Sequence, residues 1–170
     1  MKQINIQYYK NQYANIILGS FENKLCLLDF RYRKLREAVD NRLKKGLNAI
    51  FVEQDDDILR DTRKQLDEYF LMQRKVFDIP LLTVGSDFQK SVWEGLLKIP
   101  YGTTCSYLQL ATNINNEKAV RAVANANGAN ALGIIIPCHR IIGKNGTLTG
   151  YGGGLPLKKK LLELENNLFS

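Results

Sequence analysis

The chain has 170 residues, 45% of them hydrophobic, and a formal net charge of +7, which suits one large domain or two small ones with a packed core. The opening residues carry no apolar signal region and no stretch approaches membrane-spanning length, so we expect a cytoplasmic protein with no membrane partner. Three scattered cysteines without a CxxC pair, together with a single histidine, argue against a structural zinc site.

The N-terminal part of the chain is rich in strand patterns. Apolar segments at 13–19 and 24–30 flank a turn at 19–23 and predict a β-hairpin. Another strand is expected around residues 77–82, and it leads to Gly85, which we take as a domain boundary.

A helix is expected between these strands. Charged residues dominate as far as position 46, after which apolar residues between positions 58 and 71 recur near helical spacing. The aspartate run at 55–57 is interpreted as the solvated start of this helix, because negative charge is favourable at a helix N-terminus, rather than as a metal site.

Two capping boxes follow the boundary. Ser86 with Gln89 begins a helix whose apolar stripe ends before Pro100, and Ser106 with Gln109 begins a shorter one. Each pair has the spacing at which the two side chains satisfy each other's backbone N–H groups. Two helices are therefore predicted here.

The second of these helices and the segment after it predict a helix-turn-helix. The short helix runs to about residue 111, a polar turn covers 113–116, and a helix over 117–127 is stopped by Gly128. Its alanines make the last helix slender enough for its backbone to approach a nucleic-acid groove. Alanine at helical spacing also fits packing between helices, so the residues alone leave both interpretations open.

Charge is unevenly distributed in the C-terminal half. Residues 85–170 hold nine Lys or Arg against five Asp or Glu, and between Glu117 and Glu163 seven residues are basic and none is acidic. A polyanion could approach this segment unopposed. The three lysines at 158–160 taken alone fit a solvated helix face equally well.

The segment Pro137-Cys138-His139-Arg140 follows an apolar run at 132–136. The run predicts a short buried strand, so Cys138 is expected where the backbone leaves a sheet. A thiol attacks as its thiolate and needs a nearby base or cation, and His139 is the only histidine. The alternative is that Cys138 is a small buried hydrophobe and His139 a satisfied polar residue.

Six motifs occur in order in the C-terminal half: Phe88–Trp93, Ile99–Tyr107, Ala119–Val123, Ile136–Arg140, Gly150–Gly154 and Lys158–Glu165. Together they resemble the O6-alkylguanine-DNA alkyltransferases, repair proteins that take an alkyl group from a damaged base onto their own cysteine. Residues 1–84 match this family only loosely.

The resemblance implies an α/β protein of two domains. Residues 1–84 would form an N-terminal sheet with a helix, similar to ribonuclease H, and residues 85–170 a mainly helical domain that binds DNA through a helix-turn-helix and carries out alkyl transfer. The implied partner is double-stranded DNA containing O6-alkylguanine, with O4-alkylthymine as a second possible lesion. The protein would act as a monomer, without cofactor or metal, wherever the DNA is: nucleoid or nucleus.

The resemblance also implies the catalytic roles. Cys138 would attack the alkyl carbon, His139 would act as general base through a water, and Glu165 would orient His139. Tyr107 would donate a hydrogen bond to the leaving base. The remaining implied catalytic residues are Asn130, which ties the helix-turn-helix to the predicted strand, and Lys158.

DNA contacts and a base pocket are implied in the same way. Arg121 would fill the gap left by the flipped nucleotide, because the O6 carbon is hidden in the stacked duplex. The other implied DNA-binding residues are Tyr107, Ala119, Ala122, Asn127 and Arg140. The base pocket would be lined by Pro137, Tyr151, Gly152 and Gly153. Gly152 stands where some relatives carry serine, so one side-chain hydrogen bond to the base is absent here.

Three other functions fit parts of the pattern. A cysteine hydrolase with turnover could use the same three catalytic groups, but it would need the base in direct contact with the sulfur. An alkyltransferase-like protein would bind lesions without transfer, and the presence of Cys138 argues against it. A helix-turn-helix regulator would need an additional domain.

Overall fold

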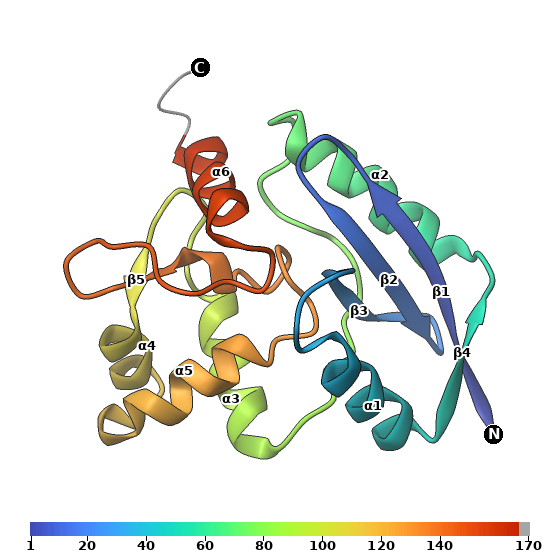
Figure 1. The fold of residues 1–170 in the computed structure, drawn as a ribbon, viewed down its shortest axis with the longest axis horizontal. Helices are drawn as coiled ribbons and strands as arrows, with labels where there is room; N and C mark the ends of the chain where they lie inside the picture. Colours follow the sequence, from blue (N-terminus) through green and yellow to red (C-terminus); the bar gives the residue numbers. More distant parts are fainter. Residues whose placement is uncertain (167–170) are drawn as a thin grey trace. The chain divides into compact units, whose positions relative to one another are not determined.

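The computed structural model describes residues 1–166 and divides the chain into two compact units, residues 1–85 and residues 86 onward. Each unit is drawn in Figure 1 with its own helices and strands. Gly85 is the last residue of the first unit. The fold agrees with the predicted class, a mixed sheet with helices followed by a mainly helical region.

The first unit is built on a four-stranded sheet in the order β3-β2-β1-β4 (Figure 1). β1 (Lys2–Lys10) is antiparallel to β2 (Asn15–Phe21) and parallel to β4 (Ala49–Glu53), and β2 is antiparallel to β3 (Lys24–Phe30). The predicted hairpin is confirmed as β2 and β3. Its two turn residues, Glu22 and Asn23, both have positive φ, as a tight two-residue hairpin turn requires.

Two helices pack against this sheet. α1 (Arg36–Leu47) buries Val39 and Leu43, and α2 (Asp57–Phe70) buries Leu59, Leu66 and Tyr69 among others. α2 is the predicted helix. The sequence did not predict α1 or β4, because α1 lies in the charge-rich stretch and only one residue of β4 is fully buried.

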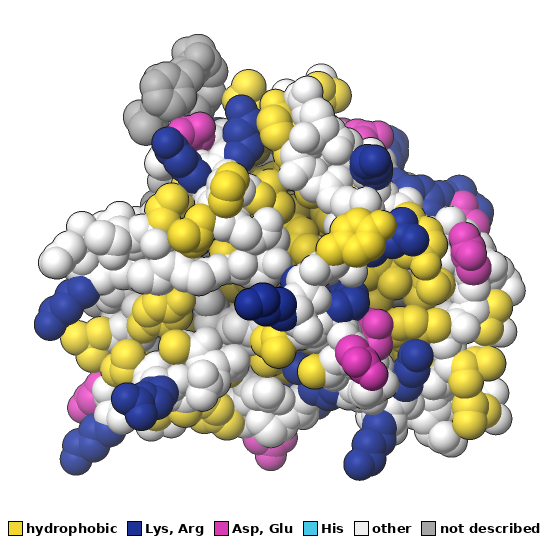
Figure 2. Space-filling view, in the orientation of Figure 1, with side chains coloured by type: hydrophobic (Ala, Val, Ile, Leu, Met, Phe, Trp, Pro, Cys, Tyr) yellow, Lys and Arg dark blue, Asp and Glu magenta, His cyan; other side chains and the backbone are white. Residues whose placement is uncertain are grey.

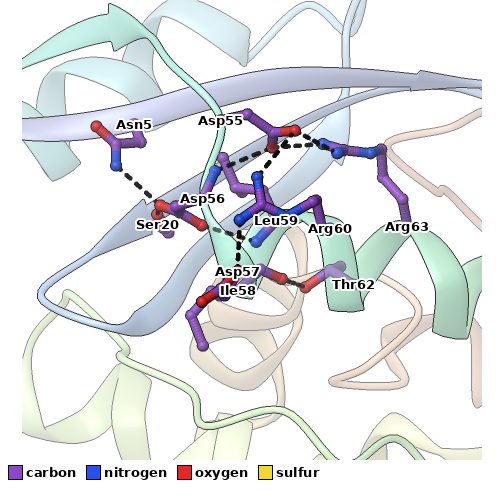
Figure 3. A network of polar contacts seen from close by, with 10 residues as sticks. All are labelled: Asn5, Ser20, Asp55, Asp56, Asp57, Ile58, Leu59, Arg60, Thr62 and Arg63. Carbon is purple, nitrogen blue, oxygen red and sulfur yellow. Dashed lines mark hydrogen bonds and ion pairs between the residues drawn. The ribbon is translucent and has the colours of Figure 1, made fainter.

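The aspartate run begins α2, as predicted (Figure 3). Asp56 is the N-cap, and its carboxylate accepts hydrogen bonds from the Leu59 backbone N–H at 2.8 Å and from Asn5 at 2.8 Å. Ser20 donates a third. Burial raises the pKa of Asp56, but these hydrogen bonds outweigh it and hold the pKa below its usual value. The network joins β1, β2 and α2.

The strand expected around residues 77–82 is wrong. The segment makes a single bridge to β3: Leu25 donates its N–H to the Pro80 carbonyl and Leu82 donates to the Leu25 carbonyl, both at 2.8 Å. Pro80 has no N–H to donate, so a regular ladder cannot run through this position.

The second unit is mainly helical. Its helices are α3 (Asp87–Leu97), α4 (Tyr107–Asn113), α5 (Val120–Gly128) and α6 (Leu155–Asn166), with two 3₁₀ turns, η1 (Glu117–Ala119) and η2 (Cys138–Arg140). The two-residue strands β5 (Cys105–Ser106) and β6 (Ile141–Ile142) pair in parallel. α3 packs on α5, where the Trp93 ring N–H donates to the Ala126 carbonyl at 2.9 Å.

Of the two predicted capping boxes, the first is confirmed and the second is half right. Ser86 and Gln89 cap each other's backbone at the start of α3. Ser106 caps α4, but the Gln109 side chain donates forward to Asn113 at 2.8 Å instead of back to the cap. An i,i+4 side-chain bond has replaced the reciprocal cap.

The predicted helix over 117–127 has different bounds. It begins as the 3₁₀ turn η1, and α5 continues through Gly128 to a C-cap at Ala129. Gly128 does not have the left-handed conformation of a glycine stop, so its role as terminator is a wrong prediction. α4 and α5 pack together across a turn at Asn115, as the helix-turn-helix requires.

The buried strand predicted at 132–136 is also wrong, because the segment forms turns. Ile134 has a φ of 68°, and Ile136 donates its N–H to the Leu132 carbonyl at 2.8 Å. In place of a neighbouring strand, the Asn130 side chain donates to the Ile136 carbonyl at 2.9 Å and accepts from the Leu132 N–H at 3.0 Å. One buried amide therefore satisfies backbone groups at both ends of an apolar turn.

Candidate active site

Cys138 is the first residue of η2, not the end of a strand, and it is buried, with 8% of its surface exposed. Pro137 precedes it, and the Cys138 N–H donates to the Ile136 carbonyl at 2.8 Å. That carbonyl also accepts the Asn130 amide. Asn130 therefore fixes the backbone that precedes the thiol, through Ile136 rather than Cys138.

His139 is fully buried and lies beside Glu165 of α6. Its Nε2 is 2.6 Å from Glu165 Oε2, while its Nδ1 has no hydrogen-bond partner within residues 1–166. The ring meets Tyr151 edge to face with centroids 6.4 Å apart. The face drawn in Figure 2 accordingly shows no histidine. The predicted histidine and glutamate are thus brought together, with one ring nitrogen left to accept a proton.

Arg140 completes this cluster and does not face solvent. Its Nε and Nη2 donate to Glu165 at 2.7 and 3.1 Å, and its Nη1 donates to the Ile99 carbonyl at 2.7 Å. The prediction that Arg140 contacts DNA is therefore corrected: the guanidinium is buried and bonded on both sides. Arg140 instead fixes the position of the Glu165 carboxylate.

The charges of this cluster set its protonation. Burial raises the pKa of Glu165, but the hydrogen bonds from His139 and Arg140 and the charge of Arg140 outweigh it and hold the pKa at about 2. Burial lowers the pKa of His139 below 6.5, and the contact with Glu165 offsets this only in part. At neutral pH the site therefore holds a carboxylate beside a neutral imidazole, the form that can take up a proton.

Lys158 of α6 is another buried charge at the site. The residue is fully buried, and its Nζ donates to the Thr149 carbonyl at 2.8 Å. Burial lowers the pKa of Lys158, and attraction to the charge of Cys138 offsets this only in part. This coupling indicates a cation close enough to favour the thiolate of Cys138.

The three cysteines have different surroundings. Burial in the sheet raises the pKa of Cys26 to about 12, and burial also raises the pKa of the half-buried Cys105. Cys105 lines a cleft of about 640 Å³ that contains none of the predicted site residues. Only Cys138 lies beside a histidine and a lysine, so it is the best candidate nucleophile.

Tyr107, the first residue of α4, is half-buried. Its hydroxyl oxygen lies 3.5 Å from Thr149 Oγ1. Thr149 belongs to the loop between β6 and α6 and was missed by sequence reasoning, because a threonine in a glycine-rich loop carries no signal of its own.

The predicted DNA-contacting residues of the helix-turn-helix separate into two groups. Arg121 and Ala122 are exposed on α5, and Ala119 at the end of η1 is half-buried. Asn127, in contrast, is only 7% exposed. The helical period places Asn127 with Val123 and the other buried residues of α5. Asn127 was predicted to contact DNA, but the structure places it in the core of the second unit.

The predicted base-pocket residues lie on both sides of Cys138 along the chain. Pro137 is buried beside the thiol, Tyr151 and Gly153 are half-buried, and Gly152 is exposed. Their contacts with a base stay predictions. None of the helices within residues 1–166 is long and apolar enough to cross a membrane.

Comparisons with known proteins agree with this geometry. Residues 4–83 match the family described as 6-O-methylguanine DNA methyltransferase, ribonuclease-like domain, and residues 87–167 match its DNA binding domain. A methylated-DNA–protein-cysteine methyltransferase of Methanosarcina barkeri is 43% identical over 89% of this chain and 90% of its own. The inducible methylated-DNA–protein-cysteine methyltransferase of Bacillus subtilis is 40% identical over 92% of this chain and 87% of its own.

Solved structures extend the likeness to the fold. The crystal structure of Mycobacterium tuberculosis OGT in complex with DNA is 34% identical with a TM-score of 0.80, over 97% of this chain and 93% of that one. An O6-methylguanine DNA methyltransferase of Methanococcus jannaschii is 26% identical with a TM-score of 0.64, over 96% of this chain and 95% of that one. The chain therefore belongs to the family of methylated-DNA–protein-cysteine methyltransferases.

Proposed function

We propose that this chain repairs DNA by moving an alkyl group from the O6 atom of guanine onto Cys138, once per molecule. The observation that carries the proposal is the buried cluster in which Cys138 precedes His139, and His139 Nε2 lies 2.6 Å from Glu165. It supplies a nucleophile, a base and a fixed carboxylate in one place.

The proton path begins at the thiol. Side chains of adjacent residues generally diverge, so the Cys138 proton passes through a water to the open Nδ1 of His139. The resulting imidazolium is stabilised by Glu165, whose pKa of about 2 keeps it charged throughout. Lys158 adds a buried positive charge that favours the thiolate.

The displacement itself is a single step. The sulfur of Cys138 bonds to the alkyl carbon as the bond between that carbon and guanine O6 breaks, and guanine leaves with the electron pair. Tyr107 donates a hydrogen bond to the ring nitrogen where negative charge develops, so it stabilises the transition state more than the bound lesion. The guanine anion is then protonated, and the thioether remains on the protein.

DNA is engaged by the second unit. α5 enters the minor groove, its alanines allow close approach, and Arg121 fills the space of the flipped nucleotide. We assign DNA binding and transfer to residues 85–170 and the ribonuclease-like scaffold to residues 1–84. The protein acts as a monomer on duplex DNA, in the nucleoid of a prokaryotic cytoplasm or in a eukaryotic nucleus.

Intact-mass measurement tests the proposal. After incubation with duplex DNA containing O6-methylguanine, the protein is expected to gain the mass of one methylene, localised to Cys138, with unmodified guanine restored. Cys138→Ser should bind the lesion without transfer, because a hydroxyl is far less ionised than a thiol. Cys105→Ser is the matched control, a half-buried cysteine of the same unit that lines a different cleft, and should behave as the native chain.

Other outcomes would assign other functions. Repair beyond one equivalent would identify an enzyme with turnover. Stable binding of lesion DNA with an unchanged protein mass would identify a lesion-binding protein without transfer. Labelling at Cys26 or Cys105 would remove Cys138 from the chemistry.

A further inference from the structure

Thr149 contacts two residues with proposed catalytic roles. Its side-chain Oγ1 lies 3.5 Å from the Tyr107 hydroxyl, and its backbone carbonyl accepts the Lys158 ammonium at 2.8 Å. Tyr107 begins α4 and Lys158 lies in α6, so a single loop residue links two elements of the site.

The local backbone holds this threonine in place. Gly143 donates its N–H to the Thr147 carbonyl at 2.7 Å, and Gly146 donates to the Gly143 carbonyl at 2.9 Å, which closes a tight loop. A Cβ at Gly143 would lie 3.1 Å from the Thr149 methyl and 2.3 Å from Thr147 Oγ1, so this glycine makes room for both side chains. Threonine is stiff at χ1, so with its methyl packed here its hydroxyl direction is restricted.

We propose that Thr149 is a positioning residue that aims the Tyr107 hydroxyl at the leaving base. The inference rests on the proposed function. When Thr149 donates to the phenolic oxygen, the phenol keeps its own proton to donate to guanine. Accepting that hydrogen bond also makes Tyr107 a stronger donor, since linked hydrogen bonds polarise one another.

The separation of 3.5 Å suits this role. It is longer than the usual O–H···O distance of about 2.7–2.8 Å, so the contact restrains the phenol weakly and does not compete with the base. Hydrogen bonds of catalytic groups are often long before the substrate binds and shorten in the complex. The Lys158 contact uses the backbone carbonyl, so side-chain substitution of Thr149 leaves its acceptor atom in place.

A double-mutant cycle tests the inference. Single-turnover transfer from O6-methylguanine duplex DNA would be measured for the native chain, Thr149→Val, Tyr107→Phe and the double variant. Thr149→Val keeps the shape and removes the hydroxyl, and we expect transfer to slow by about threefold to tenfold, the range of one neutral hydrogen bond. In the Tyr107→Phe background the same substitution should change nothing further.

Additional variants and measurements separate positioning from folding. Thr149→Ser keeps the hydroxyl and should retain most of the native rate, and Thr149→Ala should match Thr149→Val. Thr147→Val, at an exposed threonine of the same loop, should be neutral. Because Tyr107 acts on the base, free O6-benzylguanine should be slowed as much as duplex DNA, with DNA affinity unchanged.

The inference is overturned if Thr149→Val and Thr149→Ala react at the native rate, or if the loss is equally large in the Tyr107→Phe background. The proposed function fails in a different way, through the absence of any mass gain at Cys138 in the native chain. The two failures are therefore distinguishable in the same set of samples.

Discussion

Each unit of the molecule buries a carboxylate against arginine, and the pKa values of the two carboxylates shift in opposite directions. Asp29 of β3 is 1% exposed. Its Oδ1 lies 3.2 Å from Arg33 Nη1, and its Oδ2 lies 2.6 Å from Arg36 Nη1. Glu165 of α6 is 3% exposed and contacts Arg140 and His139. The pKa of Asp29 is raised, whereas that of Glu165 is held at about 2.

Hydrogen-bond geometry explains the difference. Burial penalises both charges, but Arg140 donates to both oxygens of Glu165 while His139 bonds one of them. Asp29 receives aligned donors at one oxygen alone: its Oδ1 accepts from the Phe30 N–H at 2.8 Å and from Arg33 at 3.2 Å. Arg36 lies 2.6 Å from the other oxygen without the alignment of a hydrogen bond, and its guanidinium donates to Asp40 instead. A buried charge is thus stabilised by aligned donors more than by nearby charge.

The comparison separates structural from catalytic use of the same residue types. Around Asp29 no base or nucleophile is present among the contacts described, and the cluster joins β3 to the start of α1. Around Glu165 the cluster ends on an imidazole with an open nitrogen next to Cys138. We therefore expect disruption of the first cluster to change stability alone and disruption of the second to change chemistry as well.

The largest effect is expected for His139→Gln. Glutamine keeps a hydrogen-bonding side chain but cannot take up the thiol proton, so transfer to Cys138 should slow by about 10²–10⁴-fold, the usual contribution of a general base. Single-turnover transfer, followed by intact mass, measures it. A loss below about tenfold would mean that Lys158 alone supports the thiolate, and the contrast between the two clusters would weaken.

These contrasts also mark what could be predicted from the sequence. The Ser86 cap, the β2–β3 hairpin and α2 depend on neighbours a few residues away, so local patterns predicted them. Cys138, His139 and Glu165 were found through family motifs, and the structure brings the latter two together.

Interactions between distant segments could not be predicted in this way. The family resemblance implied that Arg140 touches DNA, whereas its partner in the structure is Glu165. That partner is 25 residues away, and no pattern within one segment reveals the pair. The apolar run at 132–136 was taken for a strand because β-branched residues favour strands, whereas the Asn130 side chain supplies the hydrogen bonds of a missing neighbour. The contact between Thr149 and Tyr107 likewise joins residues from distant segments.

The next prediction compares the two carboxylates directly. Glu165→Gln leaves the Arg140 guanidinium buried without a charge partner, so we expect a loss of about 3–5 kcal/mol in the free energy of unfolding. Asp29→Asn should cost less, about 1 kcal/mol, because Arg36 keeps Asp40 and the oxygen of the new side-chain amide can still accept a backbone N–H. Urea unfolding of the full chain measures both.

Activity per folded molecule gives the second half of this test. Asp29→Asn should transfer at the native rate, whereas Glu165→Gln should be slowed, since the imidazolium of His139 loses its counter-charge. Equal stability losses for the two variants, or slowed transfer in Asp29→Asn, would show that the clusters do not differ in the way proposed.

The exposed Arg121 extends the comparison to DNA. Arg121→Ala should slow transfer from duplex DNA by about tenfold while leaving free O6-benzylguanine unaffected, because only the duplex requires base flipping. Arg31→Ala is the matched control in the first unit, where the guanidinium stacks on Tyr8 at 4.0 Å, and it should not affect either substrate. Equal losses on both substrates would show that Arg121 supports the fold instead.

The smallest expected effect is a difference in the sign of the response to acid. The pKa of Glu165 is lowered from 4.5 to about 2, so its contribution to stability is complete above its unfolded pKa and is lost as the pH falls toward the folded one. His139, whose pKa is also lowered, acts in the same direction. The pKa of Asp29 is raised above 3.8, so its contribution is complete at low pH and is lost as the pH rises through the folded pKa.

Melting temperatures of the native chain, Glu165→Gln and Asp29→Asn between about pH 5 and about pH 3 measure these signs. The advantage of the native chain over Glu165→Gln should shrink as the pH falls, because the carboxyl of Glu165 takes up a proton in the unfolded chain while Arg140 and His139 still hold it charged in the folded one. Its advantage over Asp29→Asn should grow, because a protonated Asp29 no longer bears a poorly stabilised buried charge. Parallel trends in the two comparisons would mean that both carboxylates are stabilised alike, and that aligned donors do not account for their difference.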